Sequence, residues 1–250
     1  MMGPMRVALQ YVMSAIFIVQ MYLMMAVMAV VFLPWALISP AGAFAACHSY
    51  CRWVRFTARW LIGLRTEIRG APPRDVVLVA AKHQSFLDIL LIFSAMPRPR
   101  FIMKRELIWT PILGQYALRL GCIPVNRGKR GAAIKQMIAD VASGKDKGGQ
   151  LAIYAQGTRV APGVKAPYKI GIGALYKELG QDCVPVATNV GVFWPRHGIL
   201  RKPGVAVVDF LPRIPAGKPL PEFMAELEAA IETRSDDLLA EAGFRPGDPV

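Results

Sequence analysis

Residues 76–90 read VVLVAAKHQSFLDIL, an apolar run that leads directly into a polar turn. The apolar part, Val76–Ala81, has the length and β-branched content of a buried strand, and a helix is expected after the turn. His83 lies in the turn, and Asp88 follows five residues later. Asp88 can then fold back and orient the imidazole, as a general base requires. The alternative interpretation is an ordinary loop histidine beside an aspartate that caps the helix.

Similar apolar runs recur along the chain, and helical stretches separate several of them. The predicted strands are Val76–Ala81, Phe101–Met103, Cys122–Val125, Leu151–Tyr154, Val184–Thr188 and Val205–Phe210. The predicted helices are Asp88–Met96, Pro111–Leu120, Ala132–Ser143, Ile170–Leu179 and Leu220–Ala242. This alternation predicts the α/β class, with a mixed sheet flanked by helices.

The N-terminal part has a different composition. No Lys, Arg, Asp or Glu occurs between Arg6 and Arg52, and Tyr11–Leu33 is almost uninterrupted apolar sequence. This run exceeds the roughly 20 residues that cross a hydrocarbon core, although it could equally form a re-entrant hairpin with the next helix. We therefore expect a membrane-associated helical pair over residues 1–70 and an α/β domain over residues 71–250.

The second helix of that pair is expected from Ala41 to about Leu64, because Pro34 and Pro40 interrupt the first. It carries basic residues on one face and aromatic residues on another, namely Arg52, Arg55 and Arg59 opposite Trp53, Phe56 and Trp60. This pattern is typical of a helix in the headgroup region of a membrane, and it also suits a helix packed on the domain. Because most basic residues follow the apolar run, the α/β domain is expected on the cytoplasmic side.

The chain has a formal net charge of +13 and is 54% hydrophobic. The long uncharged N-terminus favours an anionic membrane over nucleic acid as the partner of this charge. The four cysteines lack the paired spacing of a zinc site, so we predict no metal and interpret them as reduced packing residues. They are Cys47, Cys51, Cys122 and Cys183.

Basic residues also follow three of the predicted strands. The carboxyl ends of strands in an open α/β sheet are where ligands bind. Cations at these ends, together with a glycine for close backbone approach, predict a phosphate site. The residues in question are Lys104, Arg105, Arg127, Gly157 and Arg159.

Taken in order, these motifs resemble the 1-acylglycerol-3-phosphate acyltransferases of the glycerolipid acyltransferase superfamily. The match covers residues 75–190 and comprises His83–Asp88 for His-x-x-x-x-Asp, Phe101–Leu107 for aromatic-Ile-x-Lys-x-Glu-Leu, Gly121–Arg127 for a strand ending in Arg, Tyr154–Arg159 for Phe-Pro-Glu-Gly-Thr-Arg, and Val184–Val186 for Val-Pro-Val. Two positions depart from the family pattern, since Ala155 replaces a proline and Gln156 replaces a glutamate.

The resemblance implies transfer of a fatty acyl group from a thioester of coenzyme A or acyl carrier protein to the free hydroxyl of lysophosphatidic acid. The product would be phosphatidic acid, and no bound cofactor is implied. His83 and Asp88 would be catalytic, and the substrate-binding residues would be Lys104, Arg105, Arg127, Gln156, Gly157, Thr158 and Arg159. We also expect a bacterial protein at the inner membrane, with its catalytic domain facing the cytoplasm.

Two other interpretations stay open. One is an acyltransferase for another lysolipid, such as a lyso-ornithine lipid, which the replacement of the family glutamate by Gln156 would permit. The other is a non-enzymatic, membrane-anchored lipid-binding protein of the same fold. The intact pair of His83 and Asp88 argues against the second interpretation.

Overall fold

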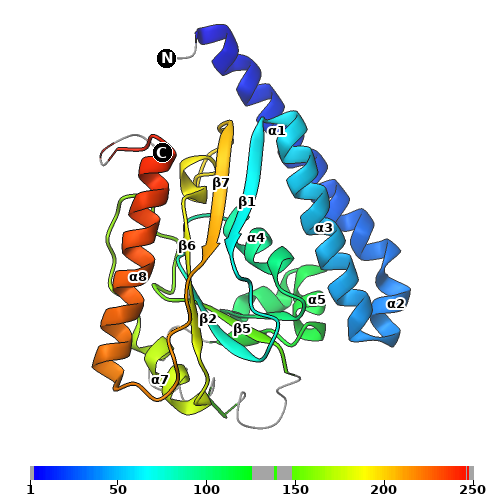
Figure 1. The fold of residues 1–250 in the computed structure, drawn as a ribbon. Coiled ribbons are helices and arrows are strands. Elements are labelled where there is room, and N and C mark those ends of the chain that lie inside the picture. Colours follow the sequence, from blue (N-terminus) through cyan, green and yellow to red (C-terminus); the bar gives the residue numbers. More distant parts are fainter. Residues whose placement is uncertain (1–2, 126–137, 140–147, 246, 248–250) are drawn as a thin grey trace.

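The computed structural model describes residues 3–125, 138–139, 148–245 and 247. Helices cover both faces of one central sheet (Figure 1). Within the described residues the sheet has seven strands, in the order β1-β7-β6-β2-β5-β3-β4. The strands are β1 (Leu64–Gly70), β2 (Val77–Ala81), β3 (Pro99–Lys104), β4 (Ile123–Val125), β5 (Gln150–Tyr154), β6 (Cys183–Thr188) and β7 (Gly204–Phe210).

Neighbouring strands run parallel except β6 and β7, which pair antiparallel. The carboxyl ends of β6, β2, β5, β3 and β4 therefore meet at one edge of the sheet, and β1 and β7 run the other way. This arrangement confirms the predicted mixed α/β sheet, and all six predicted strands are present.

The strand β1 was not predicted, and it lies in a stretch that had been grouped with the N-terminal helices. Its sequence, LRTEIRG, is mostly charged or polar, and only Leu64 is buried. The reason is its position at the edge of the sheet, where it pairs with β7 alone and needs little apolar surface. The division at residue 70 stays a prediction, although β1, which precedes it, belongs to the sheet of the α/β domain.

The α-helices are α1 (Pro4–Val31), α2 (Leu33–Ile38), α3 (Pro40–Leu61), α4 (Leu87–Ala95), α5 (Leu113–Arg119), α7 (Ile170–Leu179) and α8 (Leu220–Glu241), and two short 3₁₀ helices are η1 (Arg105–Trp109) and η2 (Val190–Val192). They confirm the predicted helices except Ala132–Ser143, which lies almost entirely outside the described residues. Pro34 and Pro40 occupy the first turns of α2 and α3, where a missing N–H costs nothing. The expected helical pair is thus α1 and α3, joined by α2.

The long helix α1 packs against α3 along one of its sides, with both helices lying to the same side of the sheet (Figure 1). Two polar residues of the apolar run face inward, Gln20 toward α3 and Ser14 toward the segment after η2. Gln20 Nε2 donates to Thr57 Oγ1 at 3.0 Å, and its Oε1 accepts from Trp53 Nε1 at 2.7 Å. Ser14 Oγ accepts a hydrogen bond from the backbone of Arg201 at 2.9 Å.

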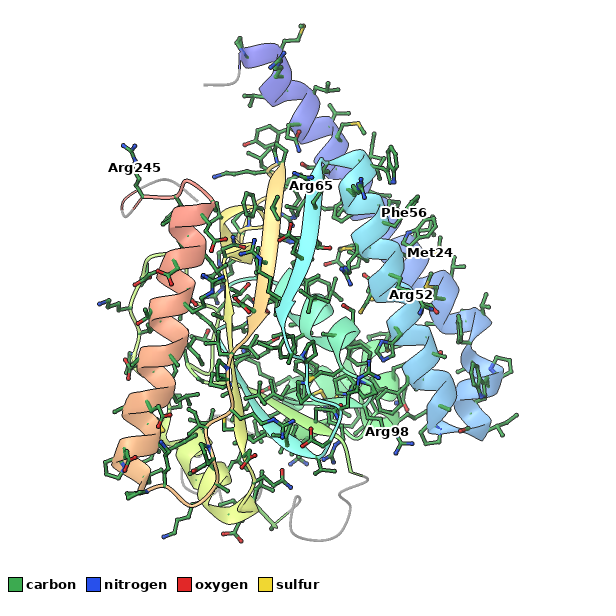
Figure 2. All side chains as sticks on the ribbon, in the orientation of Figure 1. Met24, Arg52, Phe56, Arg65, Arg98 and Arg245 are labelled. Atoms are coloured by element: carbon green, nitrogen blue, oxygen red, sulfur yellow. The ribbon has the colours of Figure 1, made fainter. Side chains whose placement is uncertain are left out.

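The remaining sides of α1 carry exposed apolar residues such as Val19 and Leu23. Among the described residues, α1 is the one helix whose length and composition would suit a membrane span. The outer side of α3 is exposed as well, and Figure 2 shows Arg52 and Phe56 there. Trp53 and Arg55 differ from the predicted pattern, because both face inward. Arg55 donates to Thr66 and Ser94 rather than to solvent.

Successive side chains of β2 point to opposite sides of the sheet and so belong to two different hydrophobic clusters. Val77, Val79 and Ala81 pack on the side of α1, α3 and α4, whereas Leu78 and Ala80 pack on the side of α7 and α8. Lys82 continues the second set, where it is buried and forms an ion pair with Glu232 of α8. Tyr168 Oη donates to the same carboxylate at 2.9 Å. The acidic helix α8 therefore holds the end of β2 in place.

Candidate active site

His83 and Asp88 form a hydrogen-bonded pair in the turn between β2 and α4. His83 Nδ1 lies 2.9 Å from Asp88 Oδ1. The other carboxylate oxygen, Oδ2, accepts from the backbone N–H groups of Gln84 at 2.8 Å and Ser85 at 2.7 Å. Asp88 is fully buried, in the first turn of α4. The carboxylate therefore closes the turn with one oxygen and orients the imidazole with the other.

This geometry determines which nitrogen of His83 can accept a proton. An ionised carboxylate only accepts hydrogen bonds, so Nδ1 carries the hydrogen and Nε2 has a free lone pair. Nε2 makes no hydrogen bond within the described part of the chain, and the side chain is 12% exposed. The histidine is thus held in the tautomer that a general base needs.

Tyr154 is part of this site, although no role for it was predicted. Its ring stacks on the imidazole of His83, with centroids 3.8 Å apart and planes 17° from parallel. The strand register explains the contact, because Tyr154 pairs with Ala81 at the ends of β5 and β2. Burial, with the charge of Asp88 nearby, holds the pKa of the Tyr154 phenol well above its usual range. Tyr154 therefore acts as a neutral, flat support for the imidazole.

Backbone hydrogen bonds join this turn to the loops that follow β5 and β6. Val160 N donates to His83 O at 2.8 Å, and Gly191 N donates to the side chain of Gln84 at 2.9 Å. These bonds cross long distances in the sequence, and sequence patterns did not indicate them. Together they hold the turn that carries His83 against the loops after β5 and β6.

The predicted substrate-binding residues lie at the same edge of the sheet but differ in exposure. Lys104 ends β3 and Arg105 begins η1, and both are exposed. In the loop after β5, Gln156 is buried, Gly157 is half-buried, and Thr158 and Arg159 are exposed. Arg127 lies outside the described residues. No hydrogen bond or ion pair within the described segments joins Lys104 or Arg105 to His83 or Asp88.

Gly157 has a φ of +69°, a conformation that glycine adopts without strain. Its N–H donates to Tyr154 O at 2.9 Å, which closes the turn after β5. That N–H is therefore already used within the loop. The glycine shapes the loop and lets the chain reverse direction beside His83.

A family model described as Acyltransferase matches residues 65–189, which is half of the chain and includes every motif described above. The chain belongs to the acyltransferase family. This acyltransferase is 28% identical over 196 residues to the 1-acyl-sn-glycerol-3-phosphate acyltransferase of Pseudomonas aeruginosa, an alignment that covers 78% of this chain and 76% of that protein. It is 31% identical over 135 residues to the human 1-acyl-sn-glycerol-3-phosphate acyltransferase alpha, covering 52% of this chain and 48% of the human protein.

The fold of the acyltransferase is also similar to a crystal structure of the 1-acyl-sn-glycerophosphate (LPA) acyltransferase PlsC from Thermotoga maritima. The TM-score is 0.78, with 94% of this chain and 99% of that chain covered. Because the two sequences are only 16% identical, this likeness concerns the fold. The family resemblance and the fold class predicted from sequence are both confirmed.

The departure at Gln156 gives a testable prediction. The side chain is buried, Nε2 donates to Ala166 O at 3.3 Å, and Oε1 has no partner within the described residues. In Gln156→Glu, an ionised carboxylate would face the Ala166 carbonyl. We expect the free energy of unfolding to fall by about 1–3 kcal/mol, which lowers Tm by about 2–4 °C for each kcal/mol.

The loss should depend on pH. A buried carboxylate without a cation has a raised pKa in the folded state, so the loss of stability begins as pH rises above the pKa of the unfolded chain, is complete above the raised pKa of the folded state, and is absent in acid. Thermal melts at acidic and neutral pH measure this, with the same change at the exposed Gln115 as the control. A neutral-pH Tm equal to that of the wild type would indicate that a cation such as Arg159 pairs with the new carboxylate.

Proposed function

We propose that this acyltransferase moves a fatty acyl group from an acyl thioester to the free hydroxyl of lysophosphatidic acid and forms phosphatidic acid at a membrane surface. The observation that carries the chemistry is the buried Asp88, which orients His83 so that Nε2 is free to accept a proton. The names of the relatives in Pseudomonas aeruginosa and human support the choice of acceptor. Coenzyme A and acyl carrier protein are both acceptable carriers of the thioester.

In the proposed mechanism His83 Nε2 removes the proton from the acceptor hydroxyl as the oxygen attacks the thioester carbonyl carbon. The resulting tetrahedral intermediate collapses, the carbon–sulfur bond breaks, and the imidazolium returns its proton to the leaving thiolate. Asp88 stabilises the imidazolium while it exists. Tyr154 limits rotation of the ring by stacking on it. One ester bond forms, one thioester bond breaks, and the protein returns to its starting state.

No protein nucleophile is needed in this scheme. The four cysteines are free thiols that are buried or half-buried. Burial raises the pKa of the Cys122 thiol to about 11 and that of Cys47 to about 12, so both stay protonated at neutral pH. Neutral buried thiols are poor nucleophiles, which supports direct attack by the lipid hydroxyl.

The apolar surfaces of the N-terminal helices support a place at a membrane, and in our proposal this is the inner membrane of a bacterium, with the α/β domain on the cytoplasmic side. Exposed aromatic side chains lie on α2, α3 and η1, among them Trp35, Phe56, Trp60 and Trp109. Arg52 and Arg59 are exposed on the same helix as Phe56 and Trp60, and cations suit the anionic lipid surface. Aromatic and basic residues together favour the interfacial region.

The acceptor is tested with purified protein in detergent, labelled acyl-coenzyme A or acyl carrier protein thioester, and a panel of lysolipids. We expect the highest kcat/KM with lysophosphatidic acid. A higher value with lyso-ornithine lipid would replace the acceptor but keep the reaction type. Lack of turnover with every pair of donor and acceptor would favour the lipid-binding alternative.

Membrane association is tested by replacing both Phe56 and Trp60 with serine. Each aromatic side chain removed from an apolar environment costs about 1.5–3 kcal/mol, so affinity for anionic vesicles should fall by roughly tenfold or more per residue. The serine change at Ile170, which is exposed on the opposite side of the sheet, is the matched control. Vesicle sedimentation at two salt concentrations measures binding. Equal binding by the double variant and the control would contradict the assigned membrane face.

A further inference from the structure

A small cavity of about 120 Å³ lies between α1 and the segment that follows η2. It is close to the catalytic turn, because Phe86 from that turn forms part of its wall. Its lining combines three arginines with apolar and aromatic side chains and contains no acidic residue. The arginines are Arg159, Arg196 and Arg201, and the main apolar walls are Met21 and Trp194.

Arg201 carries a charge that the protein leaves largely uncompensated. The residue is only 8% exposed, and its guanidinium lies 4.7 Å over the ring of Trp194. Nη1 donates to Gly198 O at 3.1 Å and to Leu200 O at 3.2 Å, whereas the buried Nε has no partner within the described residues. No carboxylate in the described part of the chain forms an ion pair with it. A buried cation without a counter-charge is costly, so the site is electrostatically incomplete without an anion.

Burial also lowers the pKa of Arg201, to about 10. Desolvation without a compensating carboxylate has this effect on a cation. At neutral pH the guanidinium is still charged, and the cavity therefore carries its full positive charge.

The surrounding structure holds this arginine in place. Arg201 N donates to Ser14 Oγ at 2.9 Å, and Gln10 Nε2 donates to Arg201 O at 2.7 Å. Phe17 of α1 packs edge-on against Trp194, with ring centroids 5.4 Å apart. The polar residues that interrupt the apolar sequence of α1 therefore fix the backbone of Arg201. A preorganised cation of this kind suits ligand binding better than a solvated surface charge does.

We propose that Arg159, Arg196 and Arg201 bind one phosphate group, in a pocket whose outer wall is the N-terminal helix α1. Arginine forks match the several oxygens of a phosphate, and the cavity is far smaller than the roughly 300–1,000 Å³ of sites for larger ligands, such as a nucleotide. Arg196 Nη1 donates to Arg159 O at 3.4 Å, which connects the pocket to the loop after β5. That the phosphate belongs to the acceptor lipid rests on the proposed function, and free phosphate is the other source.

If the acceptor supplies the phosphate, α1 has a role in catalysis beyond attachment to a membrane. Its residues Ile18, Met21 and Tyr22 line the same cavity as the three arginines. A lipid could then place its phosphate among the arginines while its apolar part stays against α1. The reacting hydroxyl would lie toward Phe86 and the turn that carries His83.

Three variants test the pocket. Arg196→Ala removes an exposed side chain and should fold normally, and Arg201→Lys keeps the charge but loses the planar fork. Lys177→Met removes one exposed positive charge from α7 and is the matched control for net charge. The first measurement is the rise in Tm with inorganic phosphate at constant ionic strength, which needs no activity. The second is acceptor KM with lysophosphatidic acid and with a phosphate-free monoacylglycerol.

We expect phosphate to raise the Tm of the wild type and of Lys177→Met equally, and to have a smaller effect on the two arginine variants. If the lipid supplies the phosphate, KM for lysophosphatidic acid should rise roughly 10- to 100-fold in both arginine variants, with little change for monoacylglycerol. A loss of the Tm response with unchanged KM would assign the site to free phosphate. An equal Tm response in all four proteins, with unchanged KM, would overturn the proposal. Failure of all acyl transfer would reject the proposed function but leave the Tm result valid.

Discussion

His83→Ala should lower kcat for acyl transfer by roughly 10²–10⁴-fold, the usual cost of losing a general base. The buried carboxylate of Asp88 holds the imidazole in the orientation that leaves Nε2 free to accept a proton. Folding should be little affected, because the turn is closed by the contacts of Asp88 with the backbone of Gln84 and Ser85. Single-turnover acyl transfer, with circular dichroism to confirm folding, measures both effects.

The exposed His197 offers a matched control, because its change to alanine removes an imidazole from the surface. Turnover of His197→Ala should equal that of the wild type. If His83→Ala kept near wild-type turnover, another group would have to remove the proton from the hydroxyl. The role of the pair of His83 and Asp88 would then be structural.

Asp88→Asn should lower kcat by about as much as His83→Ala does, and it should also lower the free energy of unfolding. The carboxylate accepts hydrogen bonds from His83 and from the two backbone N–H groups of the turn. An asparagine has one carbonyl oxygen and one NH₂ group, so it cannot accept at both positions. If the oxygen stays with the backbone, the NH₂ group faces His83 Nδ1 and forces the other tautomer, whose Nε2 carries a hydrogen and cannot accept a proton.

The stability loss should be about 1–3 kcal/mol, because the alternative orientation leaves buried donors unpaired. Thermal melts and kcat are measured together, with Asp236→Asn as the control, since Asp236 is exposed on α8. A variant of Asp88 with wild-type kcat and only a lower Tm would show that the carboxylate shapes the turn without orienting the base. Equal kcat and equal Tm would contradict both roles.

Local patterns in the sequence were sufficient for six of the seven strands of the described sheet and for the pairing of His83 with Asp88. A buried strand such as β2 needs apolar residues throughout, so its composition is visible in any short window. His83 and Asp88 are separated by one turn of chain, and their contact depends only on how the backbone leaves the strand and enters α4. The same reason explains why α7 was predicted with the bounds that the structure has.

Local sequence patterns did not predict which strand lies at the edge of the sheet or which residues pack against distant parts of the chain. The strand β1 carries the charges of a solvent-exposed edge, so its sequence does not differ from that of a loop. In the sequence, Trp53 and Arg55 fit the pattern of an exposed helix surface, yet both face inward. Trp53 donates a hydrogen bond to Gln20 of α1, and Arg55 donates one to Thr66 of β1. In these cases the neighbouring element, and not the local pattern, decides whether a side chain is buried.

The amino-acid sequence by itself determined the α/β class, the apolar composition of the N-terminus, and the pairing of His83 with Asp88, because each depends on neighbours within a few residues. Only the tertiary structure decided what surrounds them. Tyr154 reaches His83 because β5 pairs with β2, and Ser14 reaches Arg201 because α1 packs beside the segment after η2. Such contacts depend on strand order and helix packing across most of the chain. The local sequence around each residue therefore does not indicate which partner it will contact.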